Sequence, residues 1–139
     1  GPLGLQFSAG GAVVDTATAL NDGKWHHVLA ALDLTTGRAT MDVDGVFAGQ
    51  RKAPDGVMRG LDPEVVILLG GEDALTAYNG VMDDVEISNG TALTGFYRFN
   101  EGAGDEVVDS SAFHAPNGTL GMDGKVASQP VRVMSTATL

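Results

Sequence analysis

The chain has 139 residues, a length that suits one globular domain, and 18 acidic against 8 basic side chains give it a formal net charge of −10. It contains no cysteine, which excludes a disulfide framework, a thiolate zinc site and a cysteine nucleophile. The negative net charge argues against nucleic acid or anionic lipid as a partner, because eight scattered basic side chains can neutralise only a few phosphates. No apolar run is long enough for a helix that crosses a membrane.

The start of the chain is unlike the rest. Residues 1–4, Gly-Pro-Leu-Gly, resemble the remnant of a cleaved purification tag, so we leave them out of the fold. Residues 5–139 contain no internal linker, charge block or low-complexity tract. We therefore expect residues 5–139 to form a single domain.

Turn signals recur along the chain and predict an all-β fold. Asn-Gly and Asp-Gly pairs favour tight turns between antiparallel strands, and no stretch keeps a helical apolar stripe over three turns. These pairs begin at Asp22, Asp44, Asp55, Asn79, Asn89, Asn117 and Asp123.

The clearest unit is a predicted three-strand meander. Residues 25–34 form a long apolar strand, and residues 38–43 then alternate between an apolar and a polar face. The pair Asp44-Gly45 turns the chain into a third strand at residues 46–48. We expect the polar face of this meander to be wet and the apolar face to be covered.

Further strands are predicted later in the chain. Residues 65–69 are a continuous apolar run, typical of a strand buried on both faces. Residues 81–88 alternate, with Asp83 on the same side as the apolar residues, and the six residues 89–94 link them to a strand at 96–100. An inward carboxylate such as Asp83 needs an ion pair, hydrogen bonds or a cation.

Three groups of segments carry a resemblance to a known family. They are Asp22-Gly23-Lys24-Trp25-His26-His27-Val28 with Thr36-Gly37 and Val43-Asp44-Gly45; Leu69-Gly70-Gly71 with residues 78–87; and residues 97–104 with Val108-Asp109-Ser110-Ser111 and Asn117-Gly118-Thr119-Leu120. In this order they resemble the central meander, the last strands and the opening strand of laminin G-like domains in the concanavalin A-like lectin/glucanase superfamily. The resemblance implies an antiparallel two-sheet β-sandwich, a jelly roll.

The motif order departs from that family, because the aspartate-rich strand leads directly into the opening strand. One interpretation is a circularly permuted or shortened sandwich, which we favour because the six-residue link has the length that neighbouring strands require. The other is that the chain joins the end of one copy to the start of the next, so that strands are exchanged between copies.

The aromatic and histidine residues before the meander have structural interpretations. Trp25 is expected to pack in the core at a strand end, with sugar stacking as the alternative. His26 and His27 are neighbours on a predicted strand, so their side chains point to opposite faces and cannot chelate one metal together. We expect one histidine to lie in the core with its hydrogen bonds satisfied, and the other to be exposed.

The carboxylates do not predict an enzyme. Asp83 and Asp84 are consecutive and face opposite ways, which rejects them as a glycosidase pair. Asp42 and Asp44 share a strand face, but Asp44 is better explained as the turn residue before Gly45. Glycoside hydrolysis therefore stays a remote alternative.

Calcium is the sharpest chemical hypothesis. It takes carboxylate, carbonyl and water oxygens, and the resemblance places a calcium site near the opening strand and its loop. The matching residues are Asp83, Glu101, Asp109 and Asn117. An ion pair between Asp83 and Arg98 is the alternative.

The function we expect is that of a non-catalytic recognition or adhesion module of a larger extracellular or cell-surface protein. It would bind glycan or protein through rim loops at residues 55–61 and 72–79, with self-association possible. The alternative is a structural spacer or assembly unit whose copies share strands. Asn89 and Asn117 satisfy the N-glycosylation rule, but both are also ordinary turn sequences.

Overall fold

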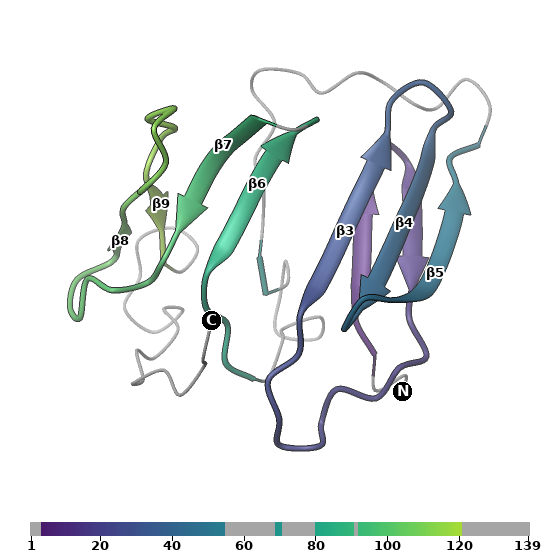
Figure 1. Ribbon diagram of the computed structural model, residues 1–139, viewed down its shortest axis with the longest axis horizontal. Helices are drawn as coiled ribbons and strands as arrows, with labels where there is room; N and C mark the ends of the chain where they lie inside the picture. Colours follow the sequence, from purple (N-terminus) through teal and green to yellow (C-terminus); the bar gives the residue numbers. More distant parts are fainter. Residues whose placement is uncertain (1–3, 55–68, 71–79, 91, 121–139) are drawn as a thin grey trace. The chain divides into compact units, whose positions relative to one another are not determined.

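The computed structural model describes residues 4–54, 69–70, 80–90 and 92–120 (Figure 1). The regular secondary structure in these ranges consists of β-strands alone, and every strand pair is antiparallel. The all-β, antiparallel prediction is therefore confirmed. The chain divides into two compact units, residues 1–68 and residues 69–139.

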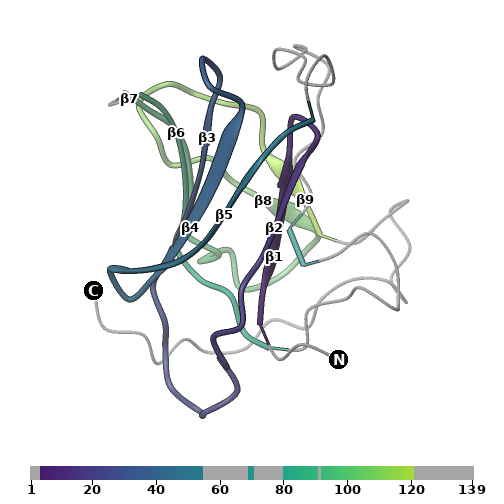
Figure 2. The same cartoon turned by 90° about the vertical axis from the view of Figure 1, so that its right-hand side faces the viewer.

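The first unit contains a hairpin and a three-stranded meander. The hairpin pairs β1 (Gln6–Ala9) with β2 (Ala12–Asp15), and the meander has the strand order β3-β4-β5. Figure 2 shows the purple hairpin as a separate layer beside the blue meander. The meander strands are β3 (Val28–Asp33), β4 (Arg38–Val43) and β5 (Val46–Lys52).

The core of the first unit lies between these two layers. Strand β4 alternates as predicted, so that Ala39, Met41 and Val43 are buried. Ala39 and Met41 pack with Ala12 and Val14 of β2, which are also buried. Burial of these side chains holds the hairpin on the meander.

The hairpin approaches β5 closely because β5 carries a glycine. A Cβ atom at Gly49 would lie 3.1 Å from Cγ1 of Val14 and 3.2 Å from the carbonyl oxygen of Asp15. A larger side chain would therefore push the two layers apart. Sequence reasoning missed the hairpin, although Gly10-Gly11 between two short strands is a two-residue turn signal.

The first strand of the meander is shorter than predicted. It begins at Val28 rather than at residue 25 and ends at Asp33. Before the strand starts, the carboxylates of Asp22 and Asp44 accept hydrogen bonds from the backbone N–H groups of Lys24 and His27, respectively. These hydrogen bonds hold the backbone there in a loop conformation. The third strand is longer than predicted and runs to Lys52.

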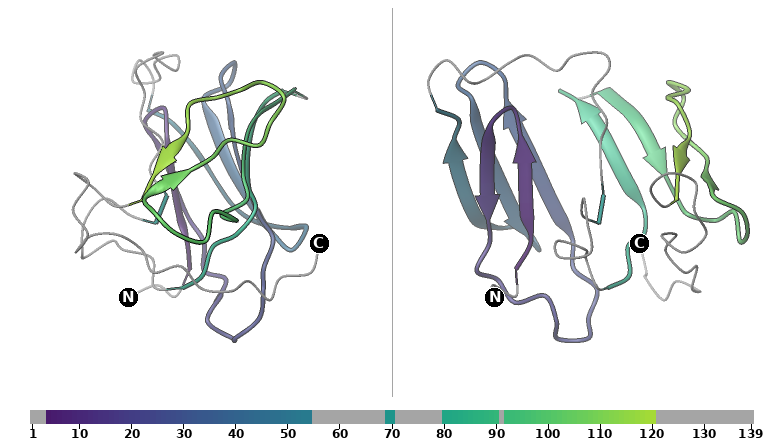
Figure 3. Two further views of the ribbon diagram at one scale, coloured as in Figure 1. Left: turned by 90° about the vertical axis from the view of Figure 1, so that its left-hand side faces the viewer. Right: turned by 180° about the vertical axis from the view of Figure 1, so that it is seen from behind.

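The second unit is built on another hairpin. Strand β6 (Val85–Asn89) pairs with β7 (Ala92–Tyr97), as two views in Figure 3 show. A short pair, β8 (Glu106–Val107) and β9 (Gly118–Thr119), follows, and a bridge between Tyr97 and Asp109 connects this part of the chain to β7.

The boundaries of the second hairpin correct the sequence prediction. Strand β6 starts at Val85 instead of residue 81, and β7 covers 92–97 instead of 96–100. The turn follows Asn89 directly, because Gly90 adopts a positive φ of 61°. Phe99 has a φ of 56°, outside the extended region, so the strand ends before it.

Other predicted features fall outside the described residues. These are residues 65–68 of the predicted strand at 65–69 and the proposed rim loops at 55–61 and 72–79. Leu69, the last residue of that predicted strand, is described and is exposed.

Burial predicts that two apolar residues of the meander contribute very differently to the free energy of unfolding. Met41 is 2% exposed and Phe47 is 61% exposed. Met41→Ala should lower the free energy of unfolding by about 2–5 kcal/mol, because it leaves a cavity. Phe47→Ala should change it by no more than about 0.5 kcal/mol. Urea denaturation followed by circular dichroism measures both, and equal losses would contradict this core.

Candidate functional site

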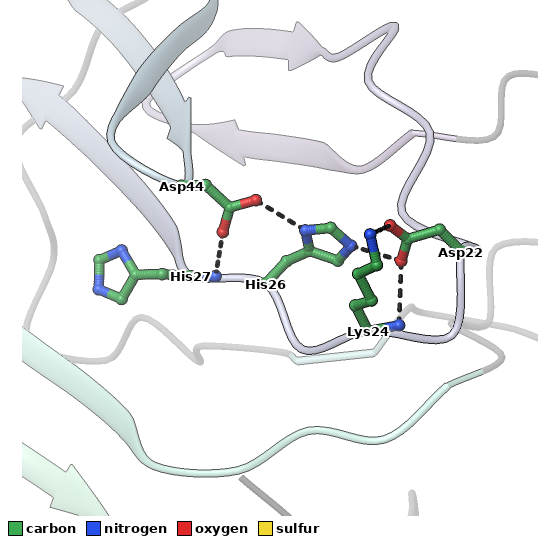
Figure 4. Close-up of polar contacts among 5 residues, drawn as sticks. All are labelled: Asp22, Lys24, His26, His27 and Asp44. Carbon is green, nitrogen blue, oxygen red and sulfur yellow. Dashed lines mark hydrogen bonds and ion pairs between the residues drawn. The ribbon is translucent and has the colours of Figure 1, made fainter. Parts of the chain in front are cut away.

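One histidine in the first unit is held between two carboxylates (Figure 4). Nδ1 of His26 lies 2.7 Å from Oδ2 of Asp44, which stands in the β4–β5 turn. Nε2 of His26 lies 2.9 Å from Oδ1 of Asp22, in the loop that leads from β2 to β3. We call these three side chains the imidazole bridge.

Backbone hydrogen bonds fix both ends of the imidazole bridge. The second oxygen of Asp44, Oδ1, accepts the N–H of His27 at 2.9 Å, and the N–H of Asp44 donates to the His27 carbonyl at 2.8 Å. Asp44 has a φ of 52° and precedes Gly45 with 77°, as a two-residue hairpin turn requires. Oδ1 of Asp22 accepts the N–H of Lys24 at 3.0 Å.

The imidazole bridge stabilises the charged form of all three groups. The hydrogen bonds to Asp44 and then to Asp22 raise the pKa of His26 above its ordinary 6.5. The hydrogen bond to His26, and then the N–H of His27, lower the pKa of Asp44. The hydrogen bond to His26, followed by the N–H of Lys24, lowers the pKa of Asp22.

The two histidines differ in exposure as predicted, but His26 is only partly buried and does not belong to the core cluster. The side chain of His26 is 16% exposed and has a partner on each nitrogen. His27 is exposed, and its ring points away from the imidazole bridge (Figure 4). Trp25 is 40% exposed and does not belong to the core cluster of this unit, so the prediction that it packs in the core is wrong.

The imidazole bridge differs from a catalytic Asp–His pair. In such a pair, one imidazole nitrogen faces the carboxylate and the other activates a nucleophile. Here a second carboxylate, Asp22, faces the other nitrogen of His26. Both oxygens of Asp44 accept hydrogen bonds, which favours the turn interpretation of this residue over a role in acid–base catalysis.

The second unit has a different polar centre, the carboxylate of Asp109. Its Oδ1 accepts the N–H groups of Phe96 at 2.8 Å and Ser111 at 3.0 Å. Its Oδ2 accepts the hydroxyl of Ser111 at 2.7 Å and the N–H of Ala115 at 2.6 Å. One side chain thus connects β7 to the loop that follows Asp109.

This arrangement stabilises the ionised carboxylate of Asp109. Burial raises its pKa, but the hydrogen bonds donated by Phe96, Ser111 and Ala115 outweigh burial and lower the pKa to about 2. Stability from this group is therefore complete above its ordinary pKa of 3.8 and is lost as the pH falls toward 2.

The predicted calcium ligands Glu101, Asp109 and Asn117 lie near one another but bind protein groups. Oε1 of Glu101 accepts the N–H of Val108 at 2.7 Å, and Oδ1 of Asn117 accepts the N–H of Asp109 at 3.0 Å. Nδ2 of Asn117 donates to Glu106. With four donors on the Asp109 carboxylate, these residues do not fit a calcium ion in this arrangement.

The fourth predicted ligand, Asp83, also has a local partner. Its Oδ1 accepts the N–H of Asp84 at 2.9 Å. Nε of Arg98 lies 3.8 Å from Oδ1 of Asp84, so Arg98 pairs with Asp84 instead of the predicted Asp83. Within the described ranges, no group of three or more His, Asp or Glu residues is arranged to hold a metal ion. These contacts do not test calcium binding itself, which stays a prediction.

The two potential glycosylation sites have different surroundings. Asn89 is the exposed last residue of β6. Asn117 is exposed as well, but both ends of its amide take part in hydrogen bonds. Glycosylation at Asn117 would replace an N–H that donates to Glu106, whereas the exposed Asn89 makes the simpler acceptor.

A row of exposed side chains crosses the meander. Strand register aligns Leu29 of β3, Asp42 of β4 and Phe47 of β5, on the face opposite buried Met41. Leu29 is 54% exposed and Phe47 is 61% exposed, while Asp42 is half-buried between them. We call these three residues the cross-strand row. Sequence reasoning missed it, because the register shift between Met41 and Asp42 places Phe47 opposite Asp42.

Comparison with known proteins decides the family. A family model described as Concanavalin A-like lectin/glucanases superfamily, of the Laminin_G_3 type, matches residues 2–95. The chain belongs to this family. The predicted resemblance is thus confirmed. Membership of this family suggests a module that binds carbohydrate or protein and that is typically non-catalytic. Neither the curated proteins nor the solved structures gave a match.

The extent of the match bears on the motif order. It runs without a break from the β1–β2 hairpin through the meander into β7. The segments that resemble an opening strand, from Tyr97 onward, lie beyond it. Among the described residues, no helix is long and apolar enough to span a membrane.

The Asp109 centre predicts an acid-sensitive second unit. Asp109→Asn should increase amide exchange at Phe96, Ser111 and Ala115, because the new NH₂ group faces two of the former donors. It should also remove the loss of protection as the pH falls below 3.8. Hydrogen exchange followed by NMR measures this, and Asp105→Asn, at an exposed position, is the control. Equal exchange in both variants would contradict the assigned role.

Calcium binding is tested by melting temperature. A calcium ion that binds the native state must raise the melting temperature after chelator treatment. If Asp109 exchanges its protein donors for calcium, calcium should raise the melting temperature of the wild type and have no effect on Asp109→Asn. An unchanged melting temperature in the wild type would contradict the calcium prediction.

Proposed function

We propose that this chain is a non-catalytic recognition module of a larger extracellular or cell-surface protein. Membership of a superfamily of carbohydrate- and protein-binding modules supports this proposal. The observation that carries it is the cross-strand row, where two large apolar side chains face solvent on the side of the meander opposite buried Met41. Exposed apolar groups gathered on a rigid sheet are typical of an interaction surface.

The cross-strand row offers two kinds of contact to a ligand. Leu29 and Phe47 supply apolar area, and the ring of Phe47 suits either a sugar ring or an apolar side chain. Asp42 adds a carboxylate between them, which accepts hydrogen bonds from hydroxyl groups or pairs with a cation. The chain's net charge of −10 favours neutral or basic ligands over acidic ones.

Replacement of Phe47 tests this proposal. Phe47→Ala should weaken binding by about 1 kcal/mol or more, roughly fivefold, because it removes exposed contact area without disturbing the core. Binding is measured on a glycan array and on immobilised extracellular proteins. Phe113→Ala, at a position 67% exposed in the second unit, is the matched control. No binding by the wild type on either surface would contradict the recognition function.

A second candidate function is an assembly unit that shares strands between copies. The continuous family match over residues 2–95, with opening-like segments after it, favours a chain that runs from one copy into the start of another. Light scattering at increasing concentration separates the two candidates. A concentration-dependent oligomer supports assembly, and a strict monomer supports a self-contained recognition module.

A further inference from the structure

We propose that the imidazole bridge is a pH-responsive latch. While His26 is protonated, it holds the loop of residues 16–27 to the β4–β5 turn, and when His26 loses its proton the loop is released at Asp22. This inference concerns conformation and does not depend on the recognition function.

The geometry requires a charged imidazole. Both nitrogens of His26 lie within hydrogen-bond distance of a carboxylate oxygen, at 2.7 Å and 2.9 Å. A neutral imidazole carries one N–H, so it donates to only one of two carboxylates. The other carboxylate then faces a nitrogen lone pair at the same short distance. Loss of the proton therefore turns one of the two attractive contacts into a repulsive one.

The two contacts are not equally replaceable. Asp44 is fixed by a pair of hydrogen bonds with the backbone of His27 and by its position in the hairpin turn. Asp22 lies in a loop, and its other partners, the N–H and Nζ of Lys24, belong to that same loop. A neutral His26 therefore keeps Asp44 and loses Asp22. The part of the loop around Asp22 then separates from residues 26 and 27, which stay bound to the turn through Asp44.

The charges around His26 support the same conclusion. The groups that face it are Asp22 and Lys24 from the loop and Asp44 from the turn, while the ring of His27 points away (Figure 4). With His26 protonated, these charges sum to zero. Without that proton, two carboxylates face a single ammonium group, which lies 3.8 Å from Asp22 on a largely exposed side chain.

The direction of the pH dependence follows from the sign of each shift. The pKa of His26 is raised, so the latch is complete below pH 6.5 and is lost as the pH rises through the raised value. The pKa values of Asp22 and Asp44 are lowered, so the latch is complete above pH 3.8 and is lost as the pH falls through the lowered values. The latch is thus complete between pH 3.8 and pH 6.5, and it opens only beyond the lowered aspartate pKa values on one side and the raised His26 pKa on the other.

The chain contains its own reporter of the latch. Trp25 is its one tryptophan, adjoins His26 and is 40% exposed. Two signals are followed on the full chain from about pH 5 to about pH 9, the range in which histidine titrates. They are the NMR signal of the His26 ring, identified by its absence in His26→Gln, and the fluorescence of Trp25.

The wild type should show a His26 midpoint above pH 6.5 and a change in Trp25 emission at the same midpoint. The protection of the amides of residues 22–26, measured relative to the intrinsic exchange rate at each pH, should fall through the same transition. Trp25 emission that stays constant while His26 titrates would overturn the latch. The titration itself is read on the wild type, and His26→Gln serves here only to assign the ring signal.

Variants then test the two carboxylates. Asp22→Asn should lower the His26 midpoint and reduce the change in Trp25 emission, and His26→Gln should abolish that change. Asp42→Asn is the matched control, because it removes one charge from the end of β4 while both His26 nitrogens keep their partners. A His26 midpoint that falls equally in Asp22→Asn and Asp42→Asn would overturn the assigned contact.

Discussion

A single imidazole bracketed by two carboxylates determines how the meander begins. His26 connects the loop before β3 to the turn between β4 and β5, and Asp44 binds the backbone of His27 with its other oxygen. Pairing between β3 and β4 starts at the next position, Val28 with Val43. The register that follows places Met41 in the core and Asp42 on the opposite face. Burial of the core and exposure of the cross-strand row both follow from this register.

Carboxylates do the same kind of work elsewhere in the chain. Asp33 accepts the N–H groups of Thr35 and Thr36 in the turn that leads to β4. Asp109 accepts hydrogen bonds from Phe96, Ser111 and Ala115. Much of the acidic character that first suggested a cation site thus serves to satisfy backbone N–H groups in turns, where a charged acceptor makes a strong hydrogen bond.

The family supplies a scaffold, and the surface determines what the scaffold recognises. Here buried residues of β4 pack against a hairpin, while the opposite face of the meander presents Leu29 and Phe47 on either side of Asp42. A rigid sheet of this kind presents a ligand surface with little loss of conformational entropy on binding. The latch lies at the end of the same strands, so it regulates the loop without repacking the core.

The sequence by itself determined the fold class, because Asn-Gly and Asp-Gly turns and the period-two alternation in β4 are local signals. Its three groups of motifs carried the resemblance to the family, which the match over residues 2–95 confirms. It also assigned Asp44 to a turn for the right reason. It misplaced the ends of β3, β6 and β7, since side-chain hydrogen bonds and backbone conformations at His27, Gly90 and Phe99 decide where pairing stops. Only the tertiary structure brought Asp22, His26 and Asp44 together, because their contacts depend on chain closure across the meander rather than on spacing. The same holds for the Asp109 carboxylate, whose four donors come from three separate positions along the chain.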